Sequence, residues 1–475
     1  MRSSNLKKHG VAIPVFSLPG KYGVGDIASL RNLIQRLKDF PIDLIQVLPL
    51  NALGPFEISP YSSISAFANE LLYIDVDLLS NSPKEVNGYS NDLTVNYYDA
   101  RCIKTDVLKE SYQEFINFEN SIERQSFEVF KIKQRHWLDS YSYFHYLLDK
   151  NKCAYWDWPK KSLDCLSVQE IENVEFYSYV QWIFYEQWQT LRLEARNYGI
   201  ELMGDLPIYV SKNSADIWAD PELFQTGIHA GVPPDLYSED GQDWGNPIYD
   251  WNLMQQDNFL WWRQRMEWLK EFFDIVRVDH IRGLHDYWAV KDGFSPKETM
   301  DWTEGPRDGI IEVIREAGVE IIGEDLGLIT EDVEHWMRRL HVPGYRVFIF
   351  GWGWYSKQGQ DYGALKYKNP NSYPEHSLCC SSTHDSESLA EFLDNLTEIE
   401  RHDLCRFLNC SHIDLRKTIL KSLRDSPSKY VVHPIQDLMN LSIRINTPGT
   451  VGEKNWTSII PLDNLQTGLT EYFSE

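Results

Sequence analysis

Residues 274–280, Asp-Ile-Val-Arg-Val-Asp-His, are the starting point for the fold prediction. Their β-branched residues predict a buried strand, and the strand ends in charge at Asp279 and His280. Side chains two positions apart on a strand point to the same face, so we expect Arg277 beside Asp279. A neighbouring Arg favours the ionised carboxylate, which is the form that a nucleophile needs. Taken alone, the pair fits a structural ion pair at a strand end equally well.

The same pattern, an apolar run that ends in polar residues, recurs along the chain. We predict eight strands, at residues 11–16, 42–50, 201–210, 274–280, 319–327, 345–350, 377–382 and 429–435. Each is followed by a helix or an insertion, which predicts an α/β fold of the (β/α)₈ or TIM-barrel type. An open, doubly wound sheet is the alternative, but no glycine-rich dinucleotide loop follows the first strand.

The chain is expected to form a single catalytic barrel over residues 1–475, with large, mostly helical insertions and no separate C-terminal β domain. Between the second and third strands, at approximately residues 80–197, polar connectors alternate with helical segments, which predicts an insertion subdomain. Asp26 is placed to cap the helix that follows the first strand. A long loop is expected after the third strand, around Ala230 to Asn246.

The composition and charge of the chain argue against some classes of binding partner and indicate a cellular compartment. The net charge is −24 and no basic stretch stands out, which argues against nucleic acids and anionic membranes as partners. The seven cysteines contain no CxxC pair, and we see neither a signal peptide nor an apolar run long enough to span a bilayer. We therefore expect a cytoplasmic protein with reduced thiols. The 17 Trp and 26 Tyr are a weak indication of a carbohydrate ligand.

Four carboxylates, Asp205, Asp279, Glu324 and Asp385, each lie at the end of a different predicted strand. In a barrel these strand ends share one rim, and the active site forms there. Like charges held close raise one another's pKa, so one carboxyl can stay protonated while an Arg-supported one is ionised. This division is typical of a retaining glycosidase, which uses a nucleophile and an acid/base.

Metal binding is a competing use of clustered acids. His280, His285 and His384 do not fall in a compact ligand spacing, and no DxDxDG calcium loop is present. We therefore expect neither a metal nor another cofactor. The absence of GxxxxGK[ST] also disfavours phosphoryl transfer.

A set of motifs runs nearly from end to end of the chain. They are SLPG (17–20), YGVGD (22–26), SPY (59–61), SAFA (65–68), GDLPIYV (204–210), AGVPPD (230–235), WGNP (244–247), RVDHIRG (277–283), GEDLG (323–327), THD (383–385), QDL (436–438) and RINTPG (444–449). In this order they resemble the 4-α-glucanotransferases, also called amylomaltases or disproportionating enzymes. These form glycoside hydrolase family 77 of the α-amylase clan.

The resemblance implies roles for the residues at the rim. Asp279 would be the nucleophile, Glu324 the general acid/base, and Asp385 the carboxylate that stabilises the transition state. Arg277 and His384 would orient the nucleophile and the donor sugar. Further substrate contacts are implied for Ser59, Tyr61, Asp205, Trp244, Asn246 and Asn446. Tyr61, Asp205 and Asn446 would serve the donor side, and Trp244 either the acceptor side or packing.

The implied reaction is disproportionation. An α-1,4-glucan segment would pass from a malto-oligosaccharide or glucan donor to the 4-hydroxyl of glucose or a maltodextrin, through a covalent glycosyl-enzyme. A lid-like loop at approximately residues 225–250 would exclude water. An α-1,4-glucan hydrolase of the same clan and a catalytically silent glucan-binding protein are the alternatives. Departures from the family pattern at Arg307, Ser386 and residues 458–459 bear on acceptor choice and the transfer-to-hydrolysis ratio.

Overall fold

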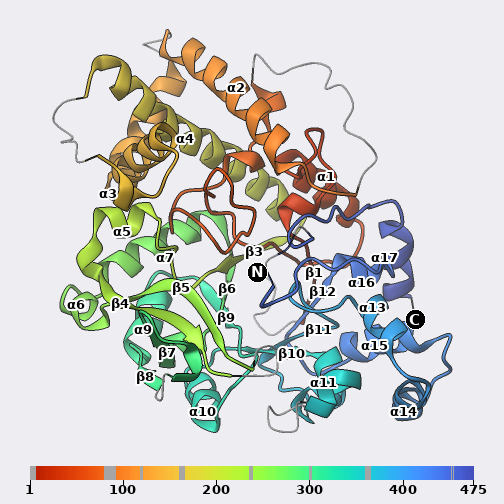
Figure 1. Cartoon of the computed structure of the whole chain (residues 1–475). Helices are drawn as coiled ribbons and strands as arrows, with labels where there is room; N and C mark the ends of the chain where they lie inside the picture. Colours follow the sequence, from red (N-terminus) through yellow and green to blue (C-terminus); the bar gives the residue numbers. More distant parts are fainter. Residues whose placement is uncertain are drawn as a thin grey trace.

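All eight predicted barrel strands are present in the structure, a computed structural model that describes residues 7–79, 93–117, 121–159, 166–234, 239–298, 302–358, 365–450, 452 and 454–474. They are β1 (Lys8–Ala12), β2 (Leu44–Gln46), β3 (Glu201–Leu206), β6 (Ile275–Val278), β9 (Glu320–Gly323), β10 (Gly344–Val347), β11 (Ser377–Cys380) and β12 (Tyr430–Pro434). Their pairings are all parallel, in the order β10-β11-β12-β1-β2-β3-β6-β9. The Gly323 N–H donates to the Pro343 carbonyl at 2.8 Å and so joins β9 to the start of β10. This closure confirms the (β/α)₈ barrel at the centre of Figure 1.

The first strand differs from its prediction. We expected residues 11–16, but β1 covers Lys8–Ala12 because these residues pair in register with Tyr430–Pro434 of β12. After β1 the chain turns into a short 3₁₀ helix, Val15–Ser17, in which the Ser17 N–H donates to the Pro14 carbonyl. The local apolar run therefore spans both a strand and the turn that follows it.

Helices and helical turns occupy most of the connections between the strands. In chain order they are α1 (Ile27–Leu37), α2 (Tyr97–Ile116), α3 (Ile122–Asn151), α4 (Val168–Asn197), α5 (Ala215–Ala219), α6 (Trp251–Gln256), α7 (Leu260–Phe272), α8 (Arg282–His285), α9 (Asp308–Glu316), α10 (Glu331–Arg339), α11 (Gly353–Gln358), α12 (Leu365–Lys368), α13 (Leu389–Asn395), α14 (Glu398–Leu408), α15 (Leu415–Arg424), α16 (Ile435–Leu438) and α17 (Leu465–Phe473). The predicted cap of α1 is confirmed, because the Asp26 carboxylate accepts from the Ser29 N–H. No helix within the described ranges is both long and apolar enough to cross a membrane.

Helices α2, α3 and α4 lie between β2 and β3, at the top of Figure 1 in orange to olive. They correspond to the described part of the insertion predicted at residues 80–197, whose first residues, 80–92, lie outside the described ranges. The fully buried Lys104 of α2 ties this helical group to the barrel. Its ammonium lies 2.7 Å from the Asp26 carboxylate and donates to the carbonyls of Leu72 and Ile74.

We expected a long loop after β3, but most of this segment forms β-strands, so the loop prediction was wrong. Strands β4 (Phe224–Val232) and β5 (Gln242–Tyr249) form an antiparallel pair in this segment. With β7 (Asp286–Lys291) and β8 (Trp302–Glu304) they make a second sheet, ordered β5-β4-β7-β8, at the lower left of Figure 1. The loop prediction failed because β4 takes its other partner, β7, from the connection after β6, which no local pattern indicates. Asp235 of the AGVPPD motif lies outside the described residues.

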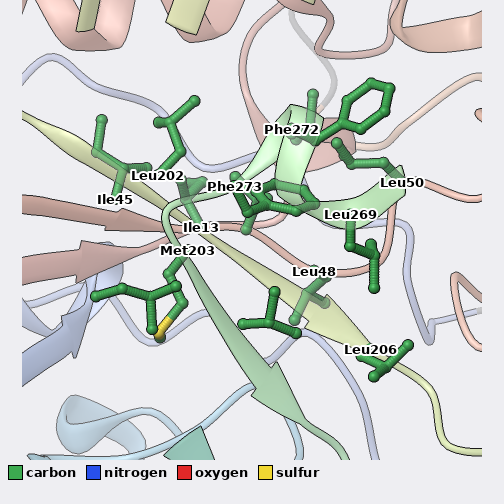
Figure 2. Close-up of a cluster of buried hydrophobic side chains, with 14 of the residues drawn as sticks. Ile13, Ile45, Leu48, Leu50, Leu202, Met203, Leu206, Leu269, Phe272 and Phe273 are labelled. Atoms are coloured by element: carbon green, nitrogen blue, oxygen red, sulfur yellow. The ribbon is translucent and has the colours of Figure 1, made fainter. Parts of the chain in front are cut away.

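The layer between the barrel strands and the helices is closely packed. Figure 2 shows part of it, in which Leu202 of β3 lies near Phe273, the residue that follows α7. Gly204 allows this approach, because a Cβ built there would lie 2.3 Å from the Phe273 ring. This close contact fixes the strand that carries Asp205.

Candidate active site

The carboxyl ends of the barrel strands surround a cavity of about 570 Å³. Every predicted site residue except Asp205 lines it: Ser59, Tyr61, Trp244, Asn246, Arg277, Asp279, Glu324, His384, Asp385 and Asn446. These residues come from widely separated parts of the chain, and closure of the barrel brings them to one rim.

Arg277 lies at the centre of the acid cluster. As predicted from their spacing, Arg277 and Asp279 point the same way, with Nη1 2.8 Å from Asp279 Oδ1. The same nitrogen lies 2.7 Å from both carboxylate oxygens of Asp205, and Nη2 lies 4.0 Å from Glu324. One buried guanidinium therefore faces three carboxylates. Burial lowers its pKa, but the negative charges of Asp205 and Asp279 outweigh that effect and raise the pKa of Arg277.

Asp205 lies beneath the cavity. Its side chain is fully buried and accepts hydrogen bonds from Arg277 and, at 2.8 Å, from the Tyr61 hydroxyl. Burial raises the pKa of Asp205, and the Arg277 charge opposes that rise. The resemblance implies a contact of Asp205 with donor-side sugar; in the structure its carboxylate binds Arg277 and Tyr61, two other residues of the site. Asp205 thus supports the cavity floor.

Glu324 is held by backbone groups on the opposite side of Arg277. Its two oxygens accept from the N–H groups of His280, at 2.9 Å, and Leu326, at 2.6 Å. His280 has a φ of 45°, a left-handed conformation that is uncommon outside glycine and that directs this N–H to the carboxylate. Burial raises the pKa of Glu324 to about 7, with Arg277 opposing the rise and Asp279 adding to it. A carboxyl with this pKa can hold or release a proton near neutral pH.

Asp385 has the opposite electrostatic environment. Burial alone would raise its pKa, but the neighbouring His384, 3.1 Å away, and the Asn446 amide, which donates at 2.7 Å, bring the pKa to about 2. Asp385 in turn raises the pKa of His384 against the effect of burial. Glu324 and Asp385 are therefore suited to different tasks, one as a proton carrier and the other as a permanent anion.

Aromatic rings flank the acid cluster. The Tyr61 ring stacks on His384, with centroids 5.6 Å apart, and the Tyr61 hydroxyl lies 3.0 Å from His384 Nε2. Trp456 packs against both rings and lines the cavity. The sequence analysis gave Trp456 no site role, since only its left-handed backbone (φ 63°) and these tertiary contacts distinguish it from other tryptophans of the chain.

The second sheet provides the wall nearest to His280. The Trp244 ring of β5 meets the His280 ring edge-on at 4.9 Å, and its indole N–H donates to Gln242. The Asn246 amide donates to the Val210 carbonyl at 2.9 Å, which ties β5 to the loop after β3. Ser59 lies at the rim, and its hydroxyl accepts from the Tyr61 N–H at 3.4 Å. The described part of the chain contains no group of three or more His, Cys, Asp or Glu side chains arranged to hold a metal ion.

Comparisons with known proteins agree with this geometry. A family model described as 4-alpha-glucanotransferase matches residues 13–463. A 4-alpha-glucanotransferase of Clostridium butyricum is 30% identical over 472 residues, covering 93% of this chain and 94% of the relative. The enzyme of the same name from Thermus thermophilus is 32% identical over 470 residues, covering 93% and 92%.

Among solved structures, the amylomaltase of Streptococcus agalactiae in complex with acarbose superposes with a TM-score of 0.88 at 27% identity. The match covers 98% of this chain and 99% of that one. The fold, the ordered motifs and the family match agree over almost the whole length. The chain therefore belongs to the 4-α-glucanotransferase family, glycoside hydrolase family 77.

Proposed function

We propose that Asp279 and Glu324 carry out the two steps of a retaining glucan transfer. In the first step a carboxylate oxygen of Asp279 forms a bond to the anomeric carbon of the donor. The glycosidic bond breaks, and Glu324 gives its proton to the departing oxygen. In the second step Glu324 takes the proton from the 4-hydroxyl of the acceptor. That oxygen then bonds to the anomeric carbon and releases Asp279.

The contrast between the surroundings of the two carboxyls carries this assignment. Asp279 lines the cavity, and its contact with Arg277 at 2.8 Å orients the carboxylate as a nucleophile. Glu324 is more enclosed than Asp279, with 11% of its side chain exposed against 27%, and its pKa of about 7 lets it donate a proton in one step and accept it in the next. An oriented carboxylate that faces the sugar and a second carboxyl that exchanges a proton near neutral pH are the two groups that this mechanism requires.

Asp385 and His384 complete the donor side of the proposed site. With a pKa of about 2, Asp385 stays negative and can stabilise the positive charge that develops on the sugar ring. Tyr61 and Asn446 hold the His384–Asp385 pair from two sides, through 3.0 Å and 2.7 Å contacts. Hydroxyl groups of the donor ring would bind between them.

The proposed substrates are malto-oligosaccharides or α-1,4-glucans as donors, and glucose or maltodextrins as acceptors. Transfer must be faster than attack by water on the glycosyl-enzyme, so the acceptor has to be bound and oriented. Trp244 offers an apolar ring face for an acceptor sugar. The segment expected to form a lid-like loop consists largely of strands β4 and β5, and these strands would exclude water from the site. We place the reaction in the cytoplasm, where the six cysteines in the described ranges would remain free thiols.

Product analysis after incubation with pure maltotriose tests the proposal. Glucose together with maltopentaose and longer chains would support disproportionation. Glucose and maltose alone would indicate the hydrolase alternative, and unchanged maltotriose would indicate a glucan-binding protein. In the same assay Asp279→Asn should lower turnover by at least about 10³-fold with an unchanged circular dichroism spectrum. Near-normal turnover by this variant would refute the assignment of the nucleophile.

A further inference from the structure

A buried carboxylate outside the cavity lies directly below the loop that carries His384 and Asp385. Asp437 lies in α16, the short helix that directly follows β12, and it is 0% exposed. Its Oδ2 accepts from the hydroxyls of Ser381 and Ser382, both at 2.6 Å. Its Oδ1 accepts from the Leu389 N–H at 2.7 Å. Both oxygens therefore have donors.

The three donors lie at the two ends of one short loop. Ser381 and Ser382 directly follow β11, and Leu389 is the first residue of α13. Residues 383–388 connect them and include His384 and Asp385. Inside the loop, Thr383 and Ser386 are joined by hydrogen bonds in both directions, among them the Thr383 N–H bond to the Ser386 hydroxyl at 2.9 Å. From outside the loop, Asn446 binds the His384 carbonyl and the Asp385 carboxylate. These contacts hold its middle, whereas the hydrogen bonds of Asp437 lie at its two ends. The Asp437 carboxylate thus fixes both ends of the loop that carries His384 and Asp385.

Asp437 takes no direct part in the cavity, although Ser382, one of its donors, lines it. Burial raises the pKa of Asp437 to about 6, and its three hydrogen bonds oppose the rise. The Arg416 guanidinium donates to the backbone carbonyl of Asp437. Burying a carboxylate costs free energy, which three well-formed donors offset only in part. An apolar residue at this position would leave the hydroxyls of Ser381 and Ser382 and the Leu389 N–H without their acceptor, so the carboxylate and the loop ends depend on one another.

We propose that Asp437 is a positioning residue for catalysis, which sets the places of His384 and Asp385 by holding both ends of the 383–388 loop. The inference rests on the proposed role of Asp385 at the donor sugar. Small displacements of an oriented charge reduce its stabilisation of the transition state more than they reduce ground-state binding. The effect should therefore fall mainly on kcat.

Asp437→Asn tests the proposal, because the amide keeps the shape but offers only one acceptor oxygen. The matched control is Asp274→Asn. Asp274, at the start of β6, also accepts from one backbone N–H (Leu202) and two side chains, Arg192 and Arg196. With maltotriose, Asp437→Asn should lower kcat by about tenfold or more with KM changed less than threefold. Asp274→Asn should leave both near the wild-type values at equal folded fraction.

Amide hydrogen exchange supplies a readout that does not depend on turnover. Exchange across residues 383–388 should become faster in Asp437→Asn and stay unchanged in Asp274→Asn. If the wild-type protein does not act on maltotriose, the proposed function fails. The hydrogen-exchange rates of the two variants still show whether Asp437 holds the 383–388 loop in place. If Asp437→Asn does not fold, Ser382→Ala, which removes one donor, should show the same local change. Unchanged exchange with wild-type kcat in the folded variant would overturn the proposal.

Discussion

At the scale of single residues, the site depends on one cation. Arg277 is the charged partner of Asp205 and Asp279, and it lies 4.0 Å from Glu324. The Asp205 side chain is 0% exposed, so its carboxylate depends on Arg277 and Tyr61 for hydrogen bonds. A guanidinium is suited to this position because it is planar, permanently charged and rich in donors.

Removing the Arg277 guanidinium should destabilise the folded protein. Arg277→Met leaves the buried Asp205 without its counter-ion, and we expect the free energy of unfolding to fall by about 3–5 kcal/mol. Chemical denaturation measures this change. Asp205→Asn in the Arg277→Met background should restore part of the loss, since the uncompensated charge is then gone. Strictly additive effects of the two substitutions would contradict a direct coupling.

The proton affinity of Glu324 predicts how the rate depends on pH. Its pKa is raised to about 7, so the carboxyl is protonated below that pH and can act as the acid. Activity on maltotriose should therefore fall as the pH rises through about 7. Glu324→Gln should be nearly inactive on maltotriose. It should still react with maltosyl fluoride, because fluoride leaves without protonation. Equal loss on both donors would argue against the assignment.

At the scale of elements, Gly204 decides how closely β3 approaches the end of α7. Gly204→Ala would place a methyl group 2.3 Å from the Phe273 ring, so strand or ring must move. We expect a loss of about 1–3 kcal/mol in the free energy of unfolding. Gly54→Ala is the matched control, since its Cβ would meet only ordinary contacts at 3.5 Å or more. Similar thermal midpoints for the two variants would disprove the steric argument.

At the scale of the whole molecule, Lys104 and Asp26 join the helical insertion to the barrel. Both side chains are almost entirely buried, at 0% and 5% exposure, so replacing Lys104 by Met leaves a buried carboxylate. We expect the free energy of unfolding to fall by about 3–5 kcal/mol. Lys297→Met, which breaks the exposed ion pair with Asp240, should leave the free energy of unfolding close to that of the wild type. Denaturant titration of both variants checks this difference, and equal effects would show that burial is not decisive.

The amino-acid sequence by itself determined the class of fold and which carboxylates stand at the ends of its strands. Apolar runs ending in charge are a local property, so the eight barrel strands were predicted, as was the pairing of Arg277 with Asp279. The capping of α1 by Asp26 was equally local. The motif order pointed to the family that the comparisons confirm.

Only the tertiary structure decided how these residues work together. Tyr61 and His384 stack although they are 323 positions apart, and no local pattern predicts that contact. Burial raises the pKa of Glu324 to about 7, and this burial depends on how the closed barrel packs. The contact of Asp205 with Arg277 depends on the same packing, because the two residues come from different strands. The pairing of β4 with β7 and the hydrogen bonds of Asp437 with Ser381, Ser382 and Leu389 likewise join residues far apart in the chain. Periodicity is set by neighbours along the chain, whereas burial, charge pairing and register are set by neighbours in space.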